Sequence, residues 1–120
     1  MGLDTSHDCW HGAYSSFNRW RTELCKVSGY GVLEDYHGFG GDTPWPKEDP
    51  LTILLYHSDC DGEIEWKDCN PIADRLERLI PALKIAGNCG GHIGNYAEKT
   101  QQFIDGLRLA ASEKENVDFH

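Results

Sequence analysis

The chain has 120 residues, a length at which one domain with one hydrophobic core is expected to span residues 1–120. Its 20 acidic and 11 basic residues give a net charge of −9, whereas a protein that grips duplex nucleic acid needs positive charge to neutralise phosphates. No apolar run approaches the ~18 residues that cross a bilayer, and the polar N-terminus carries no basic region of an export signal. We therefore expect neither duplex nucleic acid nor a membrane as a partner.

The five cysteines include no Cys-x-x-Cys pair, and an odd number without an export signal indicates reduced thiols in a cytoplasm. The usual spacing of zinc ligands is also missing, so a structural zinc site would need ligands from distant segments. The cysteines are Cys9, Cys25, Cys60, Cys69 and Cys89.

The first predicted helix runs from about Trp10 to Val27, where apolar residues recur at the helical period. Arg21 falls within this apolar face. Its side chain either snorkels at the edge of the face or forms an internal ion pair, or it points into a ligand pocket. The sequence leaves these interpretations open.

Residues 29–50 are rich in glycine and proline and predict a long irregular loop, with a short strand at residues 31–36. A loop of this length in a compact domain is usually functional. The near-continuous apolar run Leu51–His57 then predicts a strand that is buried on both faces.

Two further helices complete the pattern. One opens at Asn70 with Pro71 at its first position, and the other follows Asn95, which would form a capping box with Glu98. Residues 116–120 predict a short terminal strand. The predicted fold class is therefore α+β, with three amphipathic helices packed on a small β-sheet in a single domain that carries a long Gly/Pro-rich loop.

An acidic turn follows the predicted strand and resembles the calcium-binding loop of EF-hand proteins. Its ligand positions are taken by His57, Asp59, Asp61, Glu65 and Asp68, with a glycine at the sharp turn. The first ligand should be Asp and the last a bidentate Glu, so both ends depart from the pattern. The alternatives are a tight Asx-type turn between strand and helix, and a site where the His, Asp and Cys side chains contact a substrate.

A second cluster, His7-Asp8-Cys9-Trp10-His11, begins the first predicted helix. In a helix His7 and His11 would share one face, as in a two-histidine metal site, although the inner Glu of the helical zinc proteases is missing. One alternative is a ligand pocket, and another is a nucleophile–base pair formed by Cys9 and a histidine. In a third, the histidines are hydrogen-bonded polar residues near the start of the helix with no function.

A third cluster, Gly90 to Asn95, directly precedes the last predicted helix. Glycines let backbone N–H groups converge, and the helix N-terminus adds partial positive charge, so the turn can hold a phosphate or a carboxylate. The alternative is a plain flexible loop before a capped helix.

Three clusters that met around one cavity would form a site for a small polar ligand. Aromatic rings would stack on a planar group of the ligand, and Arg21 would hold an anion. The residues predicted to contact the ligand are His7, Asp8, Trp10, His11, Tyr14, Arg21, His57, Asp59, Asp61, Gly91, His92 and Asn95. The predicted metal ligands, for calcium at the acidic turn, are His57, Asp59, Asp61, Glu65 and Asp68.

Three segments carry a resemblance to known proteins: Leu3–Tyr14, Leu55–Ile64 and Lys99–His120. They are similar to a family of small proteins that phages and prophages encode, for which no activity is assigned. The resemblance implies a viral accessory protein that acts in the cytoplasm of a bacterial host. Small phage proteins of this kind often counter host defence, in some cases by sequestering nucleotide immune signals.

Three functions are in competition. The favoured one is a non-enzymatic protein that binds a small polar ligand, such as a nucleotide signal, in a pocket that a homo-oligomer would seal. The second is a metal-binding protein or metal-dependent hydrolase that uses the His and Asp clusters, with calcium or zinc as the ion. The third is an inhibitor that covers a host enzyme with its acidic surface.

Overall fold

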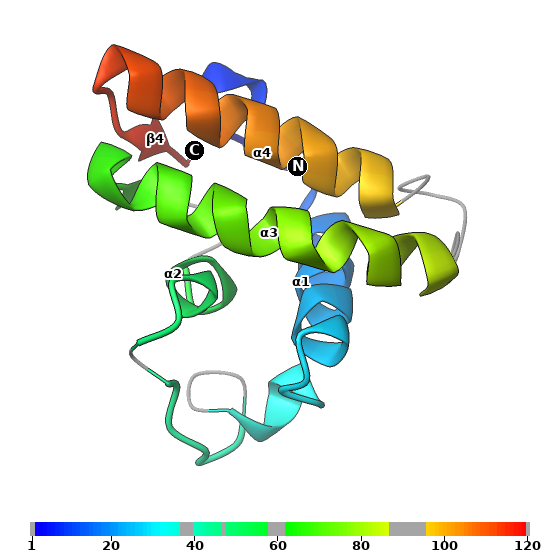
Figure 1. Ribbon diagram of the computed structural model, residues 1–120. Coiled ribbons are helices and arrows are strands. Elements are labelled where there is room, and N and C mark those ends of the chain that lie inside the picture. The colour runs from blue at the N-terminus through cyan, green and yellow to red at the C-terminus, as the bar shows by residue number, and fades with distance from the viewer. Residues whose placement is uncertain (1, 37–39, 47, 58–61, 87–95, 120) are drawn as a thin grey trace.

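Four α-helices, two 3-10 helices and two antiparallel two-stranded sheets make up the described part of the chain (Figure 1). The structure is a computed structural model, and it describes residues 2–36, 40–46, 48–57, 62–86 and 96–119. The α-helices are α1 Tyr14–Val27, α2 Leu51–Leu55, α3 Trp66–Ala86 and α4 Tyr96–Glu113. The strands are β1 Gly2–Asp4, β2 His11–Ala13, β3 Glu63–Ile64 and β4 Val117–Asp118, and the 3-10 helices are η1 Ser6–Asp8 and η2 Leu33–Asp35.

The two long helices α3 and α4 lie side by side, and α1 and α2 pack against α3 (Figure 1). On the exposed side of the helix pair, Arg108 of α4 forms a hydrogen bond and two ion pairs with side chains of α3. Its guanidinium donates to Asn70 at 3.0 Å and pairs with Asp74 at 2.8 Å and Glu77 at 2.6 Å. Because these polar contacts stay outside, the facing apolar stripes of α3 and α4 remain in the core.

An aromatic cluster ties α1, α4 and the strand segments together. Trp10 stacks on Trp20 with ring centroids 5.1 Å apart, and Trp20 contacts Phe103 of α4 at 4.9 Å. Phe17 touches Phe119 beyond β4 at 6.0 Å. Buried aromatic side chains contribute large apolar areas, so this cluster is the centre of the core.

The segment between β1 and β2 lies directly on α4. Gly106 makes this approach feasible, because a Cβ on Gly106 would stand 2.4 Å from Cys9 Sγ and 2.8 Å from the carbonyl oxygen of His7. Gln102 of α4 also donates to the carbonyl of Asp8 at 2.9 Å. The segment can therefore pack this closely on α4 because Gly106 has no side chain.

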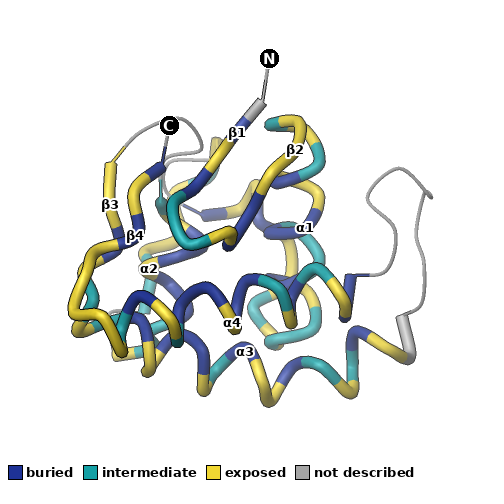
Figure 2. The backbone as a smooth tube through the Cα atoms, turned by 90° about the horizontal axis from the view of Figure 1, so that it is seen from above, coloured by how far each residue is buried: buried dark blue, intermediate teal, exposed yellow. Residues whose placement is uncertain are grey.

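The two sheets are neighbours at one end of the molecule (Figure 2). β1 pairs with β2 and β3 with β4, and an isolated bridge between Thr5 and Phe119 connects the two pairs. The backbone N–H of Asp118 donates to Ser6 Oγ at 2.9 Å. Residues near both ends of the chain thus lie beside each other.

The α+β class is confirmed, but the arrangement of three helices on one sheet is wrong, since the described residues form four α-helices and two separate sheets. None of the helices within the described ranges combines the length and the apolar character that crossing a membrane requires. The long connection after α1 contains η2 in place of the predicted strand at residues 31–36.

The predicted strand Leu51–His57 is also wrong, because Leu51–Leu55 forms helix α2. Both ends of α2 are held by polar groups: Asp49 Oδ1 accepts from the N–H of Leu51 at 2.9 Å, and Arg21 donates to the carbonyl oxygen of Leu55 at 3.2 Å. A short apolar run does not distinguish a buried strand from a buried helix by its periodicity, so these contacts decide the outcome.

The helix boundaries shift for similar reasons. The first helix begins at Tyr14 and not near Trp10, because residues 11–13 pair with β1. The second begins at Trp66 and not at Asn70, since Asn116 Oδ1 accepts from the N–H of Trp66 at 3.0 Å and caps an additional turn. The last predicted helix, which the structure describes from Tyr96 onward as α4, and the terminal strand β4 are confirmed.

We expect Gly106→Ala to lower the free energy of unfolding by roughly 1–3 kcal/mol, because the added methyl overlaps Cys9 Sγ and the carbonyl of His7. Urea denaturation measures this difference. Ser112→Ala is the matched control, since Ser112 is exposed on the same helix and should change stability by less than about 0.5 kcal/mol. Equal unfolding midpoints for the two variants would contradict the described seating of the segment on α4.

Candidate functional site

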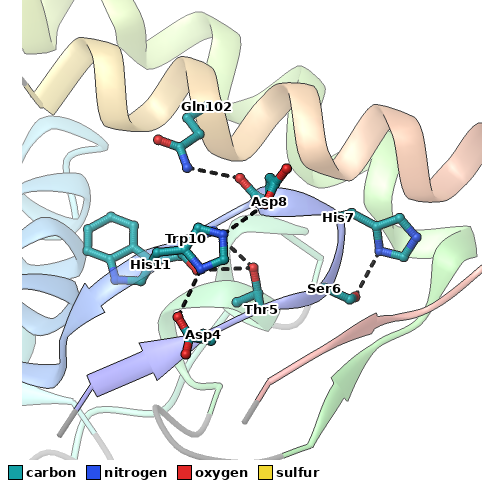
Figure 3. A network of polar contacts seen from close by, with 8 residues as sticks. All are labelled: Asp4, Thr5, Ser6, His7, Asp8, Trp10, His11 and Gln102. Carbon is teal, nitrogen blue, oxygen red and sulfur yellow. Dashed lines mark hydrogen bonds and ion pairs between the residues drawn. The ribbon is translucent and has the colours of Figure 1, made fainter.

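The polar segment Thr5–Ala13 is the part of the described structure where predicted site residues gather (Figure 3). It is held by its own hydrogen bonds: the N–H of Thr5 donates to the carbonyl of Trp10 at 3.1 Å, and Thr5 Oγ1 accepts from the N–H of Trp10 at 2.9 Å. His7 and Asp8 have φ angles of 61° and 57°, a left-handed conformation that non-glycine residues rarely adopt. Such backbone conformations persist only where the surroundings over-determine them.

His7 points to the end of α4, on the side of the segment away from Trp10 (Figure 3). Its Nε2 lies 2.9 Å from Glu115 Oε1 and 3.6 Å from Glu113 Oε1. Its Nδ1 is hydrogen-bonded to Ser6 Oγ at 2.8 Å. The three ligating atoms of His7, Glu113 and Glu115 lie within 4.8 Å of one another, so this group has the atoms and the spacing of a divalent metal site.

His11 has a different environment, between two carboxylates (Figure 3). Its Nδ1 lies 2.9 Å from Asp4 Oδ1, and its Nε2 lies 2.9 Å from Asp8 Oδ1. Hydrogen bonds to Asp4 and then to Asp8 raise the pKa of His11 above its ordinary value. The imidazolium form, which has two N–H donors, is the form that satisfies both carboxylates.

The expected helical pair of His7 and His11 is therefore wrong. His7 belongs to η1 and His11 to β2, so the two residues do not share a helix face. In the described ranges, the group of ligating side chains close enough to hold a metal includes His7 and neither His11 nor His57.

Two hollows border the segment. The first, of about 510 Å³, is a shallow groove along α4 that is lined by His7, Asp8 and α4 side chains including Gln102 and Asp105. The second, of about 450 Å³, lies at the start of α1. Its lining residues are Trp10, His11, Gly12, Ala13, Ser15, Ser16, Arg19 and Lys99. The groove is lined by carboxylates and amides, whereas the second hollow is lined by cations and hydroxyls.

The side chain of Cys9 is buried and lines neither hollow. Burial raises the pKa of its thiol to about 12, against a weaker opposing effect of the hydrogen bond from Thr5. Burial likewise raises the pKa values of Cys25 and Cys69 to about 11. Because the thiolate is the nucleophile, a thiol of this kind is inert at neutral pH, and the predicted nucleophile–base pair is not supported.

Arg21 is buried and engaged in the framework. Its guanidinium donates to the carbonyls of Leu55 and His57, lies 3.3 Å from Asn18 Oδ1, and covers the ring of Phe17 at 4.6 Å. Because the side chain is only 3% exposed, the snorkelling interpretation is wrong, while the internal ion pair and the contact with a ligand stay predictions. Tyr14, also predicted to contact a ligand, packs partly buried against the core at the start of α1.

His57 follows helix α2 and packs beside the C-terminal strand segment. Its ring contacts Phe119 with centroids 4.1 Å apart, and its Nε2 is hydrogen-bonded to the carbonyl of Glu63 at 3.0 Å. Glu65 is exposed just before α3, and Asp68 lies in the first turn of α3.

Five predicted site residues, and the capping box with Asn95, lie outside the described residues. The five are Asp59, Asp61, Gly91, His92 and Asn95. The calcium loop and the Gly-rich turn therefore stay predictions, as does the meeting of all three clusters around one cavity.

Five residues near the hollows and near His7 were not predicted as site residues: Ser15, Ser16, Arg19, Glu113 and Glu115. The available signal for the first three was a helix start with two hydroxyls, a cation one turn later and no carboxylate in the first turn. For Glu113 and Glu115 the sequence holds no such signal, because their proximity to His7 arises from tertiary packing.

No protein-family model, curated protein or solved structure matches this chain. The resemblance to proteins encoded by phages is therefore not tested by these comparisons and stays a prediction.

We expect His11 to titrate with a pKa above 6.5 in an NMR pH titration, and Asp4→Asn to lower that pKa toward the ordinary value. A raised pKa in the folded state stabilises the fold below the pKa of the unfolded chain, and this contribution is lost as the pH rises through the folded-state pKa. Because His11 is half exposed, the gain should stay below about 1 kcal/mol.

The matched control is Asp42→Asn, which removes an exposed carboxylate elsewhere and should leave the titration of His11 unchanged. A wild-type His11 that titrates at its ordinary pKa would contradict the described bridge between Asp4 and Asp8.

Proposed function

We propose that this protein is a non-enzymatic binding protein that captures a small polar ligand on the surface formed by the Thr5–Ala13 segment and α4. One observation carries the proposal. Two hollows border one segment, and four of the residues predicted to contact a ligand line them: His7, Asp8, Trp10 and His11.

The size and chemistry of the hollows support a ligand of moderate size. Their volumes of about 510 and 450 Å³ fall within the range of small-molecule sites. The groove presents the amides of Gln101 and Gln102 and the carboxylate of Asp105, which suit hydroxyl and amino groups. The second hollow presents Arg19 and Lys99, which suit negative charge. A nucleotide offers both kinds of group.

The biological part of the proposal follows from the resemblance to proteins encoded by phages. We propose an accessory protein that sequesters a nucleotide immune signal in the cytoplasm of a bacterial host. Both hollows are open on one side, and a second copy of the chain would close them.

The test is a thermal-shift panel of nucleosides, nucleotides, cyclic nucleotides and ADP-ribose. A ligand that binds only the folded chain raises the melting temperature, and a hundredfold excess over Kd corresponds to about 2.7 kcal/mol. We expect at least one nucleotide to do so, and Gln101→Trp to abolish the rise by filling the groove. Arg78→Trp, on the exposed side of α3, is the matched control. No stabilisation by any compound would contradict the proposal.

A second candidate function is the binding of a divalent metal by His7, Glu113 and Glu115. The specific observation in its favour is that one ligating atom from each residue lies within 4.8 Å of the other two. The hydrogen bond between His7 Nδ1 and Ser6 Oγ would also orient the imidazole. Glu113 and Glu115 flank Lys114, whose φ of 54° turns the chain back at the end of α4.

Isothermal titration with Zn²⁺ tests this candidate. His7→Gln should weaken binding by about tenfold or more, whereas His11→Gln, the matched control, should leave it unchanged. Equal effects of the two substitutions would contradict a site at His7.

A further inference from the structure

We infer that the hollow at the start of α1 is an anion subsite that holds a phosphate group of the captured ligand. The inference rests on the proposed function and names its ligand class, which is a phosphorylated small molecule. It assigns the polar contacts to Trp10, Arg19 and Lys99, with Ser15 and Ser16 in the first turn of the helix.

The N-terminus of α1 supplies the first element of the subsite. The N-cap position is Ala13, whose side chain has no acceptor for the free N–H groups of the first turn, and that turn contains no acidic residue. The helix has 14 residues, so its N-terminus carries the partial positive charge of a full helix. Backbone N–H groups and hydroxyls of Ser15 and Ser16 therefore face a site where an oxyanion is stabilised.

Two cations from different elements supply the charge. Arg19 comes from the second turn of α1 and Lys99 from the first turn of α4. Within the ranges that the structure describes, neither forms an ion pair, although the chain has a large excess of carboxylates. Lys99 Nζ is placed over the ring of Trp10 at 5.2 Å from its centroid. Asp4 and Asp8, the carboxylates that flank His11 at the hollow, are both hydrogen-bonded to its imidazole.

The buried indole of Trp10 is an independent indication of a ligand. Trp10 is 1% exposed, and its Nε1–H has no acceptor among the described residues. A buried donor without an acceptor is costly and rare in proteins. Gly12 lines the same hollow, and a Cβ on Gly12 would stand 3.5 Å from this Nε1. An oxyanion held at the start of α1 would bring the missing acceptor to this wall of the hollow.

Phosphate fits these donors better than a carboxylate does. The donors come from the helix start, from Arg19, from Lys99 and from the indole, and a tetrahedral group directs its oxygens toward several sides at once. At about 450 Å³ the hollow exceeds the volume of one phosphate. The remainder of the ligand therefore has room to extend from the phosphate along the protein surface.

The test uses inorganic phosphate, AMP and adenosine at constant ionic strength set with KCl. Binding is followed by ¹H–¹⁵N NMR, which resolves the indole N–H of Trp10 and the amides of Ser15 and Ser16. We expect phosphate and AMP to shift these three signals, with AMP binding more tightly, and adenosine to leave the indole signal in place.

Substitutions separate the subsite from general charge effects. Arg19→Ala and Lys99→Ala should each weaken phosphate binding by about tenfold. Lys26→Ala removes the same charge from the other end of α1 and should leave binding unchanged. Gly12→Ala adds a methyl in ordinary contact with Nε1, so it should preserve the fold, checked by the melting temperature, and still weaken phosphate binding.

The outcomes distinguish this inference from the proposed function. Equal losses in Arg19→Ala and Lys26→Ala, or an indole signal that phosphate does not move, would overturn the subsite. If AMP bound and the affinity for it were the same in Arg19→Ala and Lys99→Ala as in the unchanged chain, the proposed function would stand and the phosphate subsite would be wrong. If no compound of the panel bound at all, both would be wrong.

Discussion

The close contact at Gly106 is the constraint on which the polar surface of this protein depends. The segment between β1 and β2 rests on α4 only because this helix position has no side chain, and Cys9 and the carbonyl of His7 occupy the space of a Cβ. This seat buries Cys9, directs His7 to the end of α4 and brings Trp10 to Lys99. The acidic groove and the basic hollow are therefore two results of one packing contact.

Local sequence patterns correctly predicted the elements that are determined by their own apolar residues. The apolar stripe of α1 is buried at Phe17, Trp20 and Leu24, and β4 forms where predicted. The predictions failed where a distant residue decides. Asn116 caps α3 from 50 positions away, and Arg21 holds the end of α2 from 34 positions away. The local apolar pattern around α2 and α3 contains no information about these distant contacts. The short apolar run Leu51–His57 was therefore predicted as a strand.

The candidate site likewise has a part that the sequence predicted and a part that depends on distant residues. The cluster His7 to His11 was visible in the sequence as a concentration of ligating groups, and it does lie on the surface between two hollows. Its partners were not visible, because Lys99 and Glu115 approach it from the two ends of α4. The assumption of one helix through residues 7–11 paired the two histidines, whereas the left-handed backbone at His7 and Asp8 separates them.

The bridge between Thr5 and Phe119 has a consequence for biosynthesis. Ser6 and Asp118 are joined by a hydrogen bond across 112 positions of the chain. Closing a loop between residues so far apart in the chain costs entropy, and pairings of this kind slow folding. A ribosome must therefore release Asp118 and Phe119 before these contacts can form, so the surface around His7 is completed only after residues 1–119 have been synthesised.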